Sequence, residues 1–128
     1  MLPFTVEFRP GEPVSEQVIH AVKKAVVAGQ LAPGDRFSSV RTLSQELRIN
    51  PNTAHKVVAA LTADGVLHVQ PGIGTVIAPP AAGSTVDRAA LLNDELERLL
   101  VEAHRLGLDE DRIVAAVRKH WRKFKSTP

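Results

Sequence analysis

The residues best suited to chemistry in this chain lie in the short run Asn50-Pro-Asn-Thr-Ala-His-Lys56. Its amide, hydroxyl, imidazole and ammonium groups are those that hydrogen-bond to base edges and phosphate oxygens in duplex DNA. The surrounding residues 36–56 carry four cations and one acid: Arg36, Arg41, Arg48, Lys56 and Glu46. Such a local basic surface indicates nucleic-acid contact more strongly than the net charge of +2 does. Any solvated helix presents a polar face, however. From these side chains alone, a DNA-contacting helix and an ordinary solvent-exposed helix are about equally supported.

Catalytic and metal chemistry find little support in the residue types. The chain has no cysteine, which excludes disulfides, thiolate ligands and cysteine nucleophiles. Its five histidines show no spacing typical of a metal site. The glycines of Pro71-Gly-Ile-Gly74 lack the Lys-Ser/Thr of a phosphate-binding loop and lead into a β-type run. We therefore expect a protein that is not an enzyme and needs no metal or cofactor.

The composition is that of a globular protein, with 128 residues, 44% hydrophobic and 23% charged. Only 4% of the residues are aromatic, so the core must be built from Val, Leu and Ala. No apolar run approaches the roughly 20 residues that span a bilayer, and the N-terminus lacks the layout of a signal peptide. A cytoplasmic protein with no membrane partner is expected.

Residues 13–77 predict three helices followed by a hairpin. A first helix opens at Pro13 and stops at Gly29, with valines every four residues from 14 to 26 on its apolar face. Ser38 or Ser39 caps a second helix with inner residues Val40, Leu43 and Leu47. After a tight turn at residues 48–50, Asn50 caps a third helix whose inner face is Ala54, Val57, Val58 and Leu61.

The hydrophobic period then changes from helical to β. Residues 66–70 and 75–77 are short β-type runs on either side of Pro71-Gly-Ile-Gly74, which predicts a hairpin. The order is that of a winged helix-turn-helix, so we predict a mainly α fold with a small β-hairpin wing. In this arrangement the third helix enters the major groove, with Asn52, Thr53, His55 and Lys56 facing outward, and Arg41 meets phosphate.

A proline-rich linker, residues 79–84, separates this DNA-binding domain (1–78) from a helical tail (85–128). Ser84 or Thr85 caps a helix that ends at Gly107, and Asp109 caps a second helix. Apolar residues of the first tail helix recur at the spacing of helices that pack nearly parallel or antiparallel, and the second tail helix carries further apolar residues. A hairpin of about 40 residues cannot enclose such a seam, so we predict a homodimer. The seam residues are Leu92, Leu96, Leu99, Ala103, Leu106, Ile113, Val117 and Trp121.

Residues 13–77 resemble the GntR family of bacterial winged-helix transcription regulators. The resemblance lies in Pro13–Val18, Gly29–Arg36, Ser39–Leu43, Asn50–Ala54, Leu61–Gly65 and Gly72–Thr75, which occur in the family's order. The short two-helix tail is similar to that of the YtrA-like branch, whose members dimerise through it. Three positions depart from the usual pattern: Ser38 replaces a loop proline, and Pro51 and Pro71 stand where many members carry a basic residue.

The resemblance implies a DNA-binding regulator. It places phosphate or base contacts at Arg41, Asn52, Thr53 and Lys56, a basic or polar reader at His55, and a minor-groove contact at the wing near Gly72. We also expect Asn50, at the start of the third helix, to contact DNA. We expect a dimeric repressor of a palindromic operator, of its own or a transporter operon. Regulation by a small-molecule effector of unknown identity is an open alternative to DNA binding without an effector. The alternative is an architectural module that binds duplex DNA with little sequence preference. The basic end, residues 118–125, fits dimer packing better than an additional phosphate contact.

Overall fold

The computed structural model describes residues 2–125 except 81–82, and the side chain of Lys125 is also outside the described part. The chain forms two compact units, whose described parts are residues 2–80 and 83–125. Part of the predicted linker, residues 81–82, and the last three residues of the predicted tail therefore lie outside the described residues. In the described chain, no helix is long and apolar enough to cross a membrane.

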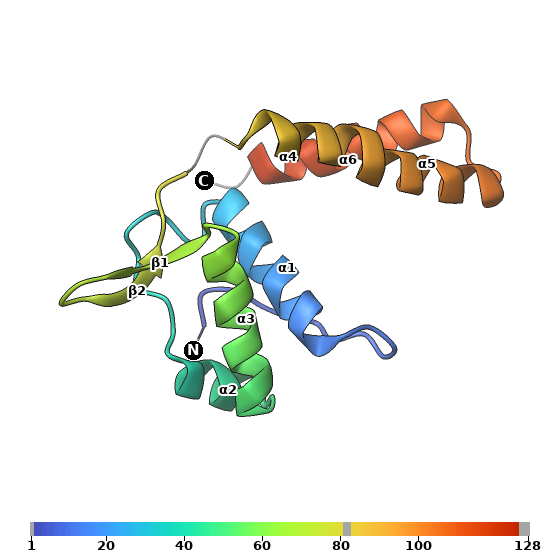
Figure 1. Cartoon of the computed structure of the whole chain (residues 1–128). Coiled ribbons are helices and arrows are strands. Elements are labelled where there is room, and N and C mark those ends of the chain that lie inside the picture. The colour runs from blue at the N-terminus through green and yellow to red at the C-terminus, as the bar shows by residue number, and fades with distance from the viewer. Residues whose placement is uncertain (1, 81–82, 126–128) are drawn as a thin grey trace. The chain divides into compact units, whose positions relative to one another are not determined.

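Helix α1, Val14–Val27, packs through one face against helix α3, Pro51–Ala63 (Figure 1). Its fully buried residues are Val18, Val22 and Ala25, whereas Val14 stays 40% exposed. The expectation of a face built on every fourth residue was therefore wrong at its first member. At 3.6 residues per turn, a step of four residues overshoots by about 40°, so such a row drifts around the helix.

Helices α2, Val40–Leu47, and α3, Pro51–Ala63, form the predicted helix-turn-helix. The Ser39 hydroxyl accepts a hydrogen bond from the Thr42 N–H at 3.1 Å, so Ser39 rather than Ser38 is the cap. At the far end of α3, the Lys23 ammonium on α1 lies 2.7 Å from the Asp64 carboxylate. Both side chains are about half exposed, so this pair contributes at most about 1 kcal/mol.

Strands β1, Leu67–Gln70, and β2, Gly74–Ile77, form the antiparallel hairpin, with Leu67 opposite Ile77 and Gln70 opposite Gly74. Residues 67–77 are called the wing below. The structure adds a partner that the sequence did not predict. The loop at 34–37 runs along the other edge of β2, where the Phe37 N–H donates to the Thr75 carbonyl at 2.9 Å. The base of the wing is thus held on both sides of β2.

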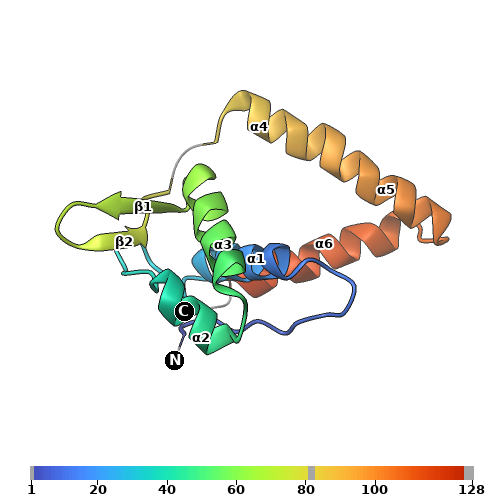
Figure 2. The same cartoon turned by 60° about the horizontal axis from the view of Figure 1, so that its bottom comes forward.

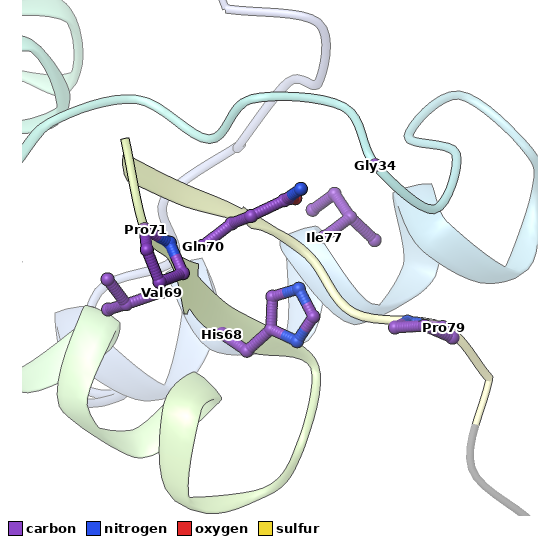
Figure 3. A pocket seen from close by; sticks show the side chains of 7 residues that line it. All are labelled: Gly34, His68, Val69, Gln70, Pro71, Ile77 and Pro79. Atoms are coloured by element: carbon purple, nitrogen blue, oxygen red, sulfur yellow. The ribbon is translucent and has the colours of Figure 1, made fainter. Parts of the chain in front are cut away.

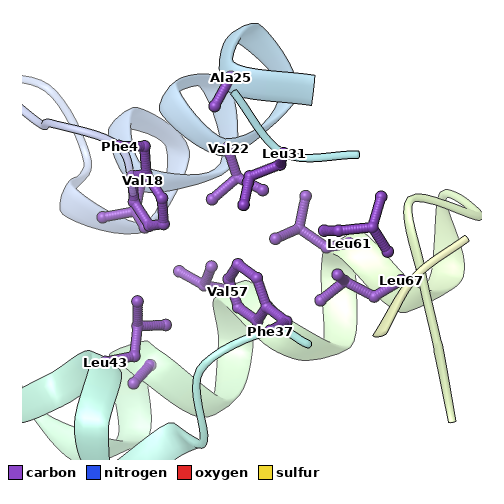
Figure 4. Close-up of a cluster of buried hydrophobic side chains, with 12 residues drawn as sticks. Phe4, Val18, Val22, Ala25, Leu31, Phe37, Leu43, Val57, Leu61 and Leu67 are labelled. Carbon is purple, nitrogen blue, oxygen red and sulfur yellow. The ribbon is translucent and has the colours of Figure 1, made fainter. Parts of the chain in front are cut away.

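The core of the first unit joins all three helices to the base of the wing (Figure 4). Leu43, Val57 and Leu61 are fully buried in it. The N-terminal segment also enters the core, because Phe4 stacks on Phe37 with ring centroids 6.2 Å apart. Gln17 holds the same segment by accepting from the Arg9 N–H at 2.7 Å. Burial of this aromatic pair fixes the loop that leads into α2.

The second unit is a helical hairpin made of α4, Thr85–Ala89, a π-helical segment η1, Ala90–Glu95, α5, Leu96–Arg105, and α6, Glu110–Lys125. Ser84 and Asp109 cap the two arms as the sequence predicts, since their side chains accept from Asp87 and Arg112 N–H groups. The π-helical segment was not predicted. It lies within the first arm of the hairpin, between α4 and α5.

Candidate nucleic-acid interface

Helix α3 has one buried and one exposed face, as a helix that is to bind DNA requires. Ala54, Val57 and Leu61 are fully buried against α1 and α2. The opposite face carries three of the predicted contact residues, Asn52, His55 and Lys56, which are exposed. Thr53 is half-buried and lies at the border of the buried face, one turn before Val57. Helix α3 packs against both α1 and α2 (Figure 2), and this packing leaves the polar side chains of α3 at the surface.

The first turn of α3 is held by its cap. The Asn50 side-chain oxygen accepts a hydrogen bond from the Asn52 N–H at 2.8 Å. Pro51 occupies the first helical position, where a backbone N–H would have no acceptor within the helix, so proline costs no hydrogen bond there. Asn50 itself is exposed. This cap orients the side chains of residues 50–53, which are the ones nearest the bases when such a helix enters a major groove.

Arg41 lies in the first turn of α2 and is exposed. Below it, Leu43 is buried completely and anchors the helix. The Ser44 hydroxyl donates to the Arg41 carbonyl at 3.0 Å, so the backbone that carries this cation is tied within its own helix. A guanidinium on a rigid, exposed helix start is suited to a phosphate oxygen.

The wing presents an uncharged tip. Its turn is closed by a hydrogen bond from the Ile73 N–H to the Gln70 carbonyl at 3.0 Å, and Gly72 has φ 79°, a value that glycine adopts without strain. Gly72 is exposed, and Ile73 and Val69 beside it expose apolar surface. The tip can therefore contact a groove by backbone and apolar groups, without a cation of its own.

One further cation belongs to this surface. Arg36 is exposed and is paired through its backbone with Val76, on the edge of β2 that β1 leaves open. The basic stretch that contains Arg36 was recognised in the sequence. Its position beside the wing follows only from a pairing between residues far apart in the chain, so no local pattern predicts it.

A shallow pocket lies beside the wing, and its lining is mainly apolar (Figure 3). Among the described lining residues, His68 is the one with a titratable side chain. No group of three or more histidine, aspartate or glutamate side chains suited to a metal occurs in the described part of the chain. The lining residues are Gly34, His68, Val69, Gln70, Pro71, Ile77 and Pro79.

Comparison with known proteins decides the family. Residues 7–77, more than half of the chain, match the family described as bacterial regulatory proteins, gntR family. The chain belongs to the GntR family. Members of this family are DNA-binding regulators of transcription and not enzymes. The chain therefore regulates transcription by binding DNA, and duplex DNA is its partner. The predicted winged helix-turn-helix fold is confirmed.

The likeness extends beyond the winged domain into the tail. The HTH-type transcriptional repressor YtrA of Bacillus subtilis is 29% identical over 109 residues, which cover 84% of each chain. Among solved structures, a transcriptional antiterminator from Listeria monocytogenes matches with a TM-score of 0.83 at 25% identity, covering 94% of this chain and 91% of that one. A GntR family regulator from the same species matches with a TM-score of 0.60 at 27% identity, covering 88% and 98%. The resemblance to short, YtrA-type members is thus confirmed.

Proposed function

We propose that this GntR-family protein is a homodimeric, cytoplasmic repressor that reads a palindromic operator. Repression follows if the dimer occupies a promoter and excludes the polymerase. The exposed polar face of α3, opposite its buried residues, carries this proposal. The similarity to YtrA, which is named a repressor, supports the direction of the effect.

The assigned DNA contacts follow from the same geometry. We assign base contacts to Asn52, Thr53 and His55, since they lie in the first turns of α3 and none of them is buried. Phosphate contacts are assigned to Arg41 and Lys56, both exposed cations. Asn50, which begins α3, and Gly72 at the tip of the wing complete the predicted set.

The dimer is assigned to the helical hairpin of the second unit. Most predicted seam residues expose apolar surface within the single chain, among them Leu92, Leu96, Leu99 and Trp121. A contiguous apolar stripe of this kind is expected to bury itself against another surface. A second copy of the same hairpin offers the complementary stripe and closes a four-helix bundle with two-fold symmetry.

Selection from random duplex DNA tests this function. Purified protein is incubated with a random duplex library at near-physiological salt, and bound sequences are amplified and read. We expect a palindrome with half-sites about 10 base pairs apart, as two recognition helices on one face of the duplex require. Its position in the host genome then names the regulated genes, with the protein's own operon or a transporter operon expected. Salt-sensitive binding without any enriched site would contradict the proposal and favour the architectural module.

A single substitution tests the assignment of the interface. Arg41→Ala should weaken binding to all duplexes and lower the slope of log affinity against log salt by about 1, because one phosphate contact is lost. Lys24→Gln is the matched control, since it removes an exposed cation at the end of α1. Equal effects of the two substitutions would mean that Arg41 acts only through net charge.

A further inference from the structure

The turn between α2 and α3 contains a strained residue. Arg48 has φ 54° and ψ 46°, the left-handed helical conformation. Every other described residue with positive φ is a glycine. In this conformation the Cβ of an L-residue crowds its own backbone, a conflict that glycine avoids. A position that suits glycine is therefore occupied here by the longest basic side chain.

The fold uses the backbone of Arg48 and not its side chain. The left-handed residue ends α2, because the Arg48 N–H and then the Ile49 N–H both bond to the Ser44 carbonyl, the latter at 3.0 Å. Glycine would make the same two bonds. The Arg48 side chain is exposed, and its guanidinium has no hydrogen bond or ion pair to any residue that the structure describes. Among the described residues, no hydrogen bond or ion pair of the Arg48 side chain therefore compensates for the strain.

The position of Arg48 in the turn suggests what its side chain binds. It lies two residues before Asn50, so their Cα atoms are at most about 7 Å apart. When the first turn of α3 enters the major groove of a duplex, the phosphates that border the groove lie close to the turn between α2 and α3. Arg41 and Lys56, on the two helices that flank the turn, give the same surface a positive charge. A guanidinium here is suited to a phosphate oxygen.

We propose that Arg48 is a DNA-backbone contact, retained in a strained turn because its charge binds an operator phosphate. This inference rests on the proposed role of α3 as the DNA-reading helix. Arg48 was not among the predicted contact residues. The contact is made to phosphate, so it raises affinity for duplexes of any sequence and contributes nothing to the choice of bases.

Arg48→Gly separates the two roles of the residue. The glycine keeps the turn and removes the strain, so the melting temperature should stay the same or rise by a few degrees. Affinity for the selected operator should fall by about 3- to 10-fold, and the salt slope should decrease by about 1. Arg48→Asn, which also tolerates the left-handed conformation, should show the same loss of affinity. Arg48→Lys should keep most of the affinity and the full slope.

Each outcome bears on the inference. A folded Arg48→Gly protein with the affinity and salt slope of the unmodified chain would overturn it, and so would an equal loss in the Lys24→Gln control. Loss of affinity in Arg48→Lys equal to that in Arg48→Gly would also contradict it, because a contact made through the positive charge should survive in lysine. If the unmodified chain itself shows no salt-sensitive duplex binding, the proposed function fails, and that result is distinct from failure of Arg48 alone.

Discussion

Asn50 combines a structural and a proposed binding role, and substitution can separate them. Its side chain caps α3, so Asn50→Ala should lower the free energy of unfolding by about 1 kcal/mol, seen as a lower melting temperature. Asn50→Ser restores the cap with a shorter hydroxyl side chain. If Asn50 is only a cap, the serine variant should regain both stability and operator affinity. Regained stability with affinity still reduced would establish the DNA contact.

Single residues were predictable wherever the signal is local. Ser39, Asn50, Ser84 and Asp109 were all expected as caps or as one of two alternatives, because a cap depends on residues two or three positions away. The left-handed Arg48 was not predicted beyond a tight turn. Residue type alone favours glycine there, and only the backbone shows that an arginine occupies the position.

At the scale of elements, the three helices and the hairpin followed from apolar periodicity, since each repeats within a short window. Two contacts that position the site could not be found in this way. The loop at 34–37 pairs with β2, and the N-terminal segment brings Phe4 onto Phe37. Both contacts join segments that are distant in sequence. Their partners are chosen by the shape of the core, which no local pattern encodes.

The stacked pair predicts a stability difference between two phenylalanines of the same segment. Phe4 is buried, so Phe4→Ala should lower the free energy of unfolding by about 3–5 kcal/mol. Phe8 is 41% exposed and is the matched control, with an expected change of no more than about 1 kcal/mol. Chemical denaturation of the two variants measures both values. Equal losses would mean that the segment is not anchored through Phe4.

At the scale of the whole molecule, the helical hairpin predicts how the chain assembles. Leu99 is 53% exposed, whereas Ala103, one turn further along α5, is 5% exposed. Leu99→Asp should leave the hairpin folded and weaken dimerisation by about 100-fold or more, because the charge enters a symmetric interface twice. Ala103→Asp should disrupt the hairpin itself.

Sedimentation analysis together with circular dichroism distinguishes these results. A Leu99→Asp protein that remains dimeric at low micromolar concentration would show that the predicted seam is not the interface. Loss of helical signal in this variant would assign Leu99 to the folding of the single chain. Operator affinity should fall together with dimerisation, since each half-site then binds separately.

Strand β1 has a consequence for the behaviour of the protein in concentrated solution. Within the described residues β1 pairs only with β2, so its outer edge offers unpaired N–H and C=O groups. Val69, on that strand, is 71% exposed, and no Asp, Glu, Lys or Arg occurs between Asp64 and Asp87. Natural sheets protect such edges with charged residues, because an open uncharged edge adds a strand from another molecule. Wings are therefore where DNA-free protein should begin to aggregate, and a lysine in place of Val69 should delay it.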